Sequence, residues 1–209
     1  MRKLINRILL FSSIVLFTAS CKSYRVEATK NGLPLLHEYQ KRYFDDVSKD
    51  YIYKANIAIY GKELSGILIF KKLDEKRHRL VLTTDFGNKL MDIELSEQDF
   101  LVHFIMEDLN RKIILNTLKK DFRLLLQKQY KIDRTYSNDN SVIAESKTGG
   151  KQYLHISKVD SLLRKVDYVP KRQSKLSLQF SPETPGFTRN INIQHHKIKL
   201  RIDLVYIGQ

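Results

Sequence analysis

Residues 79–95 read RLVLTTDFGNKLMDIEL and contain two short alternating runs joined by a polar segment. In the first run Leu80 and Leu82 share one face, and the second run, from Leu90 to Leu95, alternates in the same way. A period of two is typical of a strand with one buried face. Between the runs lies Phe86-Gly87, and glycine readily adopts the positive φ that a tight turn needs. The stretch therefore predicts a β-hairpin with a large apolar residue at its turn.

The same period continues on both sides of this hairpin. Alternation over 51–59, 64–70 and 100–106 adds three strands, and short turns between all five predict an antiparallel meander. Further strands are expected around 130–136, 141–145, 153–156, 162–169, 176–180, 191–193 and 198–204, with a loop over Ser181–Gly186 and a hairpin turn at His195-His196. The inward-facing residues of the clearest late strand are expected to be Leu176, Leu178 and Phe180. An antiparallel sheet of about eleven strands must curl or close rather than stay flat.

Two segments have helical spacing instead. Residues 108–128 predict one amphipathic helix, and Leu33 to Phe44 predicts a shorter helix with Pro34 in its first turn. The central helix offers one apolar stripe to the concave side of the curled sheet. The fold expected is therefore mainly β (α+β): a half-open antiparallel β-barrel over residues 50–209, with the central helix covering its concave face. The stripe is expected to line a cavity or simply to form core, and it consists of Ile113, Leu118, Phe122 and Leu125.

The N-terminus has the pattern of an export signal. Three basic residues among the first seven precede the apolar run Ile8–Phe17, which is too short to span a bilayer but has the length of a signal-peptide core. Small residues then lead to Cys21, the only cysteine in the chain. This segment resembles the lipobox of bacterial lipoproteins, although Thr18 stands where leucine is usual. The resemblance implies that residues 1–20 are removed, that Cys21 is acylated, and that residues 21–49 form a tether and the N-terminal helix.

The charge of the chain agrees with a membrane location. Lys and Arg number 37 against 23 Asp and Glu, a net charge of +14, and the basic residues form no block. An anionic bilayer attracts such a protein, whereas nucleic acid is a poor partner for an exported one. Lys22 follows the cysteine where retention in the inner membrane would call for Asp, which favours the outer membrane.

No motif indicates a metal, a cofactor or a catalytic centre. No two histidines have the helical i, i+4 spacing of metal ligands, and adjacent strand residues such as His195 and His196 point to opposite faces. Neither a nucleophile elbow nor a phosphate-binding loop is present in the sequence. We expect a protein that is not an enzyme, although one sequence leaves a dispersed catalytic pair open. The histidines considered are His37, His78, His103, His155, His195 and His196.

Residues 79–95, together with 53–61 and 65–70, resemble the LolA/LolB lipoprotein-carrier family and are closest to LolB, its membrane-anchored member. The resemblance implies an unclosed β-barrel with helices across its mouth. It also matches Phe86-Gly87 to the family's turn, whose large hydrophobe protrudes into solvent and helps deliver lipoproteins into the membrane. The chain departs from the family pattern in having no tryptophan.

The resemblance implies a monomeric lipoprotein on the periplasmic side of the outer membrane. It would bind acylated lipoproteins in an apolar cavity and help to insert them, with the bilayer, the acylated cargo and a periplasmic carrier protein as partners. The alternatives are a non-catalytic scaffold with the same fold and, third, an enzyme acting on envelope lipids. For Phe86 two placements stay open at this point: exposed at the tip of the turn, or folded back under the sheet.

Overall fold

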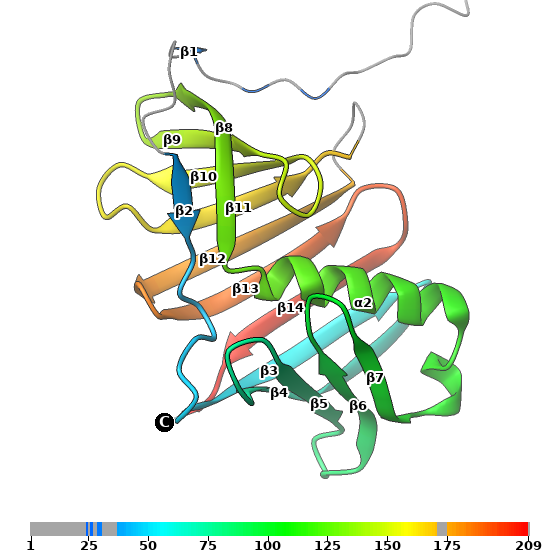
Figure 1. Ribbon diagram of the computed structural model, residues 1–209. Coiled ribbons are helices and arrows are strands. Elements are labelled where there is room, and N and C mark those ends of the chain that lie inside the picture. The colour runs from blue at the N-terminus through cyan, green and yellow to red at the C-terminus, as the bar shows by residue number, and fades with distance from the viewer. Residues whose placement is uncertain (1–23, 25, 27–28, 31–36, 171–174, 209) are drawn as a thin grey trace, which may run out of the picture.

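One antiparallel sheet curls around a single α-helix in the part of the chain that the computed structural model describes, namely residues 24, 26, 29–30, 37–170 and 175–208 (Figure 1). The strands are β1 (Thr29–Lys30), β2 (Glu38–Gln40), β3 (Asp50–Ile59), β4 (Lys62–Lys72), β5 (His78–Thr83), β6 (Lys89–Leu95), β7 (Phe100–Ile105), β8 (Gln129–Ser137), β9 (Ser141–Ser146), β10 (Gln152–Ser157), β11 (Leu163–Tyr168), β12 (Leu176–Thr184), β13 (Phe187–His195) and β14 (Leu200–Tyr206).

The strand order explains why the barrel is open. It runs β1-β8-β9-β10-β11-β12-β13-β14-β3-β4-β5-β6-β7, with β2 also paired to β8. Strands β7 and β8, the ends of the two meanders, are not hydrogen-bonded to each other in this order. The expected half-open antiparallel barrel is confirmed, and the sheet has 14 strands rather than about eleven.

The concave face of the sheet forms the core. Tyr53, Ala55 and Leu68 are fully buried, and their neighbours in each strand alternate toward solvent. Leu176, Leu178 and Phe180 also point inward, as expected, and are at most 5% exposed. Such alternation is what an antiparallel sheet shows when one face packs and the other is solvated.

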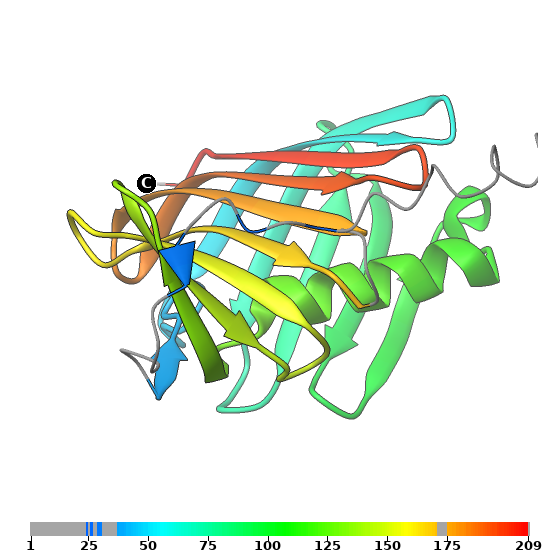
Figure 2. The same ribbon diagram turned by 90° about the horizontal axis from the view of Figure 1, so that it is seen from above.

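The central helix lies in the hollow of the sheet (Figures 1 and 2). It is α2, Lys112–Leu126, and follows the 3-10 helix η1, Glu107–Leu109, so the expected helix over 108–128 is found with a break near its start. Leu118, Phe122 and Leu125 are buried against the sheet. The inward placement predicted for Ile113 is wrong, because this residue is 60% exposed. With the helix beginning at Lys112, Ile114 takes the inward position in the first turn.

The helix expected from Leu33 to Phe44 is wrong for the described residues from 37 onward. They form β2 and then an extended segment, because β2 pairs with β8 and Lys41 N donates to Lys128 O at 2.8 Å, continuing the same pairing. We call residues 37–49 the strap. It passes over the part of the concave face that α2 leaves uncovered (Figure 1).

The loop expected over Ser181–Gly186 is also corrected. Strand β12 continues to Thr184 and pairs with β13 through register shifts on both sides of Pro182, so only Pro185 and Gly186 form the turn. Proline is tolerated within a sheet at such irregularities because its missing N–H need not join the ladder. The turn between β13 and β14 falls where the sequence predicts it.

Cys21 and the expected signal peptide lie outside the described residues. Among the described helices, none is long and apolar enough to cross a membrane.

Acid is expected to weaken the contact between strap and sheet at His78. Its ring is 5% exposed, and its Nε2 lies 3.2 Å from Phe44 O of the strap. Burial lowers the pKa of His78 to about 4. His78 therefore takes up a proton below about pH 6.5 in the unfolded chain, but only below about pH 4 in the folded chain. The free energy of unfolding falls by up to about 3 kcal/mol as the pH is lowered across this window. Urea unfolding at pH 7 and 4.5 should show a smaller acid loss for His78→Gln, and an unchanged one for the exposed control His37→Gln.

Candidate functional site

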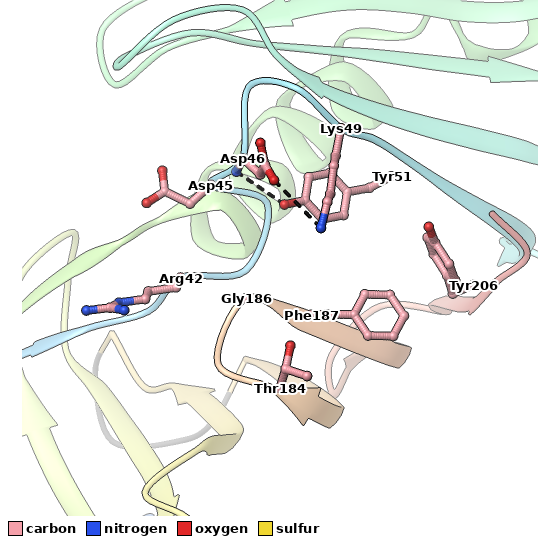
Figure 3. Close-up of a pocket in the computed structure, with 9 residues that line it drawn as sticks. All are labelled: Arg42, Asp45, Asp46, Lys49, Tyr51, Thr184, Gly186, Phe187 and Tyr206. Carbon is pink, nitrogen blue, oxygen red and sulfur yellow. Dashed lines mark hydrogen bonds and ion pairs between the residues drawn. The ribbon is translucent and has the colours of Figure 1, made fainter. Parts of the chain in front are cut away.

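A pocket of about 490 Å³ opens between the strap and the tip of the β12–β13 hairpin (Figure 3). Its volume lies within the range of small-molecule sites. The strap with the adjoining start of β3, the hairpin and the end of β14 all contribute to it, so residues 42–51 meet residues 184–206 there. The lining residues are Arg42, Asp45, Asp46, Lys49, Tyr51, Thr184, Gly186, Phe187 and Tyr206.

The inner wall of this pocket is aromatic. The rings of Phe187 and Tyr206 meet edge to face with centroids 4.6 Å apart, and Tyr206 meets the buried Tyr53 in the same way at 5.4 Å. On the other side, the ring of Tyr51 contacts Phe44 at 5.3 Å. The pocket wall is therefore continuous with the aromatic core of the barrel.

The rim of the pocket is charged, and most of its charges are already paired. Asp45 Oδ1 lies 2.7 Å from Lys72 Nζ and 2.5 Å from Lys128 Nζ. Although burial opposes it, these two ammonium groups lower the pKa of Asp45. Arg42 is exposed, forms no hydrogen bond or ion pair with the described residues, and points away from the aromatic wall (Figure 3). The rim therefore presents one unpaired cation beside an apolar wall.

Behind the pocket, the chain's own side chains fill the concave interior. The ring centroids of Phe44 and Phe70 lie 4.7 Å apart, and Phe70 meets Phe122 of α2 edge to face with centroids 6.2 Å apart. The structure brings the stripe residues Leu118, Phe122 and Leu125 into this same core, whereas Ile113 lies outside it. In the state described, these stripe residues therefore form core.

Polar contacts hold α2 to the sheet and the strap. Asp121 is fully buried, and its Oδ2 lies 2.7 Å from His195 Nε2, whereas its Oδ1 is buried without a described partner. Burial raises the pKa of Asp121. The ammonium group of Lys41 donates to Leu125 O, so the strap binds one of the last carbonyls of the helix.

The turn between β5 and β6 presents Phe86 to solvent, with 94% of the residue exposed. Gly87 has φ +87°, its N–H donates to Thr84 O at 3.0 Å, and Thr84 N donates to Asn88 O at 2.8 Å. Of the two placements left open by the sequence, the structure has the exposed one. A regular turn thus holds a large apolar ring outside the fold.

The remaining polar residues form small hydrogen-bonded groups in the described part of the chain. No group of three or more His, Cys, Asp or Glu side chains is placed there to hold a metal ion. As expected, His195 and His196 diverge: His195 bonds to Asp121, and His196 Nε2 lies 2.8 Å from Ser177 Oγ.

Sequence reasoning identified the Phe86 turn and three of the four stripe residues, but it missed the pocket. Tyr51 lies in a predicted strand, whereas Phe187 and Tyr206 fall outside the predicted elements, and no spacing joins the three. The only signal was the density of aromatic residues at strand ends, which does not say which ends meet.

Comparison with known proteins supports the fold. No protein-family model and no curated protein matches the chain. Among solved structures, it is similar to a LolA superfamily protein from Nitrosomonas europaea, with 11% identity, a TM-score of 0.52, and coverage of 80% of this chain and 87% of that one. The chain therefore has a LolA-like fold.

Two further structures are less similar. One is a DUF1329 family protein from Desulfovibrio piger, with 14% identity, a TM-score of 0.44, and coverage of 78% of this chain and 85% of that one. The other is an outer membrane lipoprotein-sorting protein domain from Vibrio parahaemolyticus, with 9% identity, a TM-score of 0.42, and coverage of 77% and 84%.

Proposed function

We propose that this chain is a non-catalytic envelope lipoprotein that binds the acyl chains of other lipoproteins and helps to insert them into the outer membrane. It would act as a monomer, anchored through an acylated Cys21 on the periplasmic side. The observation that carries this proposal is Phe86, an aromatic side chain 94% exposed at the tip of a regular turn. A bilayer that received this ring would remove its apolar surface from water, which is favourable by about 25 cal/mol per Å².

The energetics of delivery explain why such a turn matters. Each CH₂ group buried in a protein cavity is stabilised by about 0.8 kcal/mol, and a bilayer offers almost the same stabilisation. Transfer of an acyl chain is therefore nearly neutral in free energy, and the approach of the protein to the membrane governs its rate. A ring at the tip of a turn can enter the interface without any part of the barrel unfolding.

The acyl chain would enter at the pocket between strap and hairpin. Phe187 and Tyr206 form an apolar wall there, and the wall leads to the aromatic core. Binding would displace core rings such as Phe44, which requires the strap to move. The LolA-like fold of the chain agrees with this use of the concave face.

The filled interior favours a second candidate, a scaffold lipoprotein of the envelope that carries no ligand. In the structure Phe44, Phe70 and Phe122 occupy the space that a carrier would give to acyl chains. Phe86 would then contact a protein partner instead of a bilayer. The two candidates differ in whether the folded chain takes up an acyl ligand.

Replacing Phe86 with glutamate is expected to abolish delivery and leave the fold intact. An exposed turn position changes stability by no more than about 0.5 kcal/mol, whereas placing a carboxylate in the membrane interface opposes docking. The measurement is transfer of a fluorescent lipopeptide from the purified protein to liposomes, alongside a thermal melt. Binding of the lipopeptide should survive because the pocket is on another part of the sheet.

Val159→Glu is the matched control, since Val159 is also 94% exposed and lies in the β10–β11 turn. It should leave transfer unchanged. Equal transfer by the wild type and Phe86→Glu would remove Phe86 from the mechanism. Equal loss in both variants would mean that added negative charge, at any exposed turn, is what opposes delivery.

A further inference from the structure

A second apolar cluster lies on the outer, convex face of β9–β11. It consists of Ile143, Tyr153 and Val169, which are at most 6% exposed although they face away from the barrel interior. Tyr24 and Val26, from the segment that follows Cys21, pack against them together with Tyr136 of β8. The ring of Tyr24 stacks on Tyr153 with centroids 4.8 Å apart and an interplanar angle of 26°.

A buried carboxylate completes this site. Asp167 of β11 is 2% exposed, and its Oδ2 accepts a hydrogen bond of 2.8 Å from the Tyr24 hydroxyl. His155 Nε2 and Lys165 Nζ lie 3.1 and 2.9 Å from the same oxygen, and Ser177 donates to the other. Burial alone would raise the pKa of Asp167, but these donors hold it well below its usual range. The outer face thus places the ionised carboxylate of Asp167 beside the ring of Tyr153. Tyr24 bonds to the carboxylate through its hydroxyl and stacks on the ring.

We propose that this outer face is the docking surface for the chain's own lipid-bearing tether, and that Tyr24 is the latch that holds the tether there. The proposal rests on the acylation of Cys21 put forward above. Docking at Tyr24 then fixes which side of the barrel faces the anchoring membrane.

The lengths of chain involved make the latch effective. Cys21 precedes Tyr24 by three residues, which reach about 10 Å at full extension. With Tyr24 docked, the outer face of β9–β11 is therefore held close to the anchored cysteine. If Tyr24 and β1 are both released, the next fixed element is β2 at Glu38, and seventeen residues reach roughly 60 Å. Release multiplies the reach of the domain about sixfold.

The Phe86 turn lies far from the docked tether. Five strands separate β11 from β5 in the sheet. In Figure 1 the described tether segments lie at the top of the view, above β9 and β10, and the hairpin of β5 and β6 lies at the bottom. The docked tether therefore keeps the Phe86 turn away from the membrane that holds the anchor, and delivery into that membrane requires the latch to open.

Limited proteolysis of the full-length protein tests the latch. Trypsin cleaves after Arg25 and has to bind the residues on both sides of the cut. Because Tyr24 and Val26 pack on the sheet, cleavage requires these two residues to leave it. Tyr24→Ala removes one hydrogen bond and one aromatic contact, which together should raise the rate of this cut by about tenfold or more. Tyr24→Phe keeps the stack and should give a smaller increase. Tyr60→Ala is the control, because Tyr60 is 49% exposed in the β3–β4 turn and should leave the rate unchanged.

The proposal is overturned if trypsin cuts the wild type after Arg25 as fast as it cuts Tyr24→Ala. New cuts within the sheet of Tyr24→Ala would indicate global unfolding. In that case the rate of the cut after Arg25 in Tyr24→Phe, compared with the rate in the wild type, tests the proposal. These proteolysis measurements need no lipoprotein cargo, so failure of the latch is distinguishable from failure of the carrier function. If both hold, Tyr24→Ala should also deliver lipopeptide faster to the liposomes in which it is itself anchored.

Discussion

Replacing Gly66 with alanine is expected to destabilise the sheet strongly where β4 pairs with β5. Gly66 lies in β4 opposite Ala55, and a Cβ there would stand 1.9 Å from Thr83 O and 3.4 Å from Thr84 Cα. Both contacts are with backbone, so no side chain can rotate away, and β4 and β5 must separate. Glycine inside a strand commonly marks such a close approach. We expect a loss of at least about 4 kcal/mol, measured by urea unfolding with circular dichroism.

Gly186→Ala is the control for this variant. A Cβ at Gly186 meets nothing within 4 Å, and the substitution should change stability by no more than about 0.5 kcal/mol. Because Thr83 and Thr84 lead into the Phe86 turn, a partly folded Gly66→Ala protein should lose this turn before the rest of the sheet. A Gly66→Ala protein as stable as the wild type would show that β4 and β5 do not approach as closely as described.

Replacing Phe122 with alanine should cost about 3–5 kcal/mol, since it empties a large volume in a packed core. Phe122 is 1% exposed and joins α2 to Phe70 of the sheet. The measurement is the melting temperature, and Ile113→Ala on the same helix is the control. Because Ile113 is 60% exposed, its truncation should change stability by no more than about 0.5 kcal/mol.

Adding a fatty acid to the same melts separates the two candidate functions. An apolar cavity binds apolar ligands, and a ligand that binds only the folded state raises the melting temperature. If the protein is a carrier, palmitate should raise the melting temperature of the wild type, and should raise that of Phe122→Ala by more. For a scaffold, only the variant should respond, because its cavity is artificial.

The sequence predicted the five-strand meander over residues 51–106 because its evidence is local. Alternation sets the face of Leu80 and Leu82, and turn residues such as Gly87 set the ends of the strands. Exposure of Phe86 could not be decided in this way, since a turn residue of this size either protrudes or folds back. Which of the two occurs depends on contacts with residues distant in sequence, and no local pattern contains them.

The strap shows where local evidence is insufficient. The apolar spacing from Leu33 to Phe44 fits a helix, but Tyr43 and Phe44 are buried by contacts with strands that lie far away in sequence. Lys41 is the clearest case. Its ammonium group is buried and donates to Leu125 O, a contact that no pattern around residue 41 indicates. The pocket was missed for the same reason, because it exists only where the strap meets the β12–β13 hairpin.

The position of α2 sets a lower limit on the circumference of the barrel. The helix connects β7, the last strand of the first meander, to β8, the first strand of the second, and its 15 residues form a rigid strut of about 22 Å. Paired strands lie only about 4.8 Å apart, so a strut of this length holds its two ends several strand spacings apart across the hollow. The width of the hollow is thus built into the connectivity of the chain. Space for a guest molecule must come from the strap and the aromatic rings, whose displacement breaks only the short pairing of β2 with β8 and leaves the rest of the sheet intact.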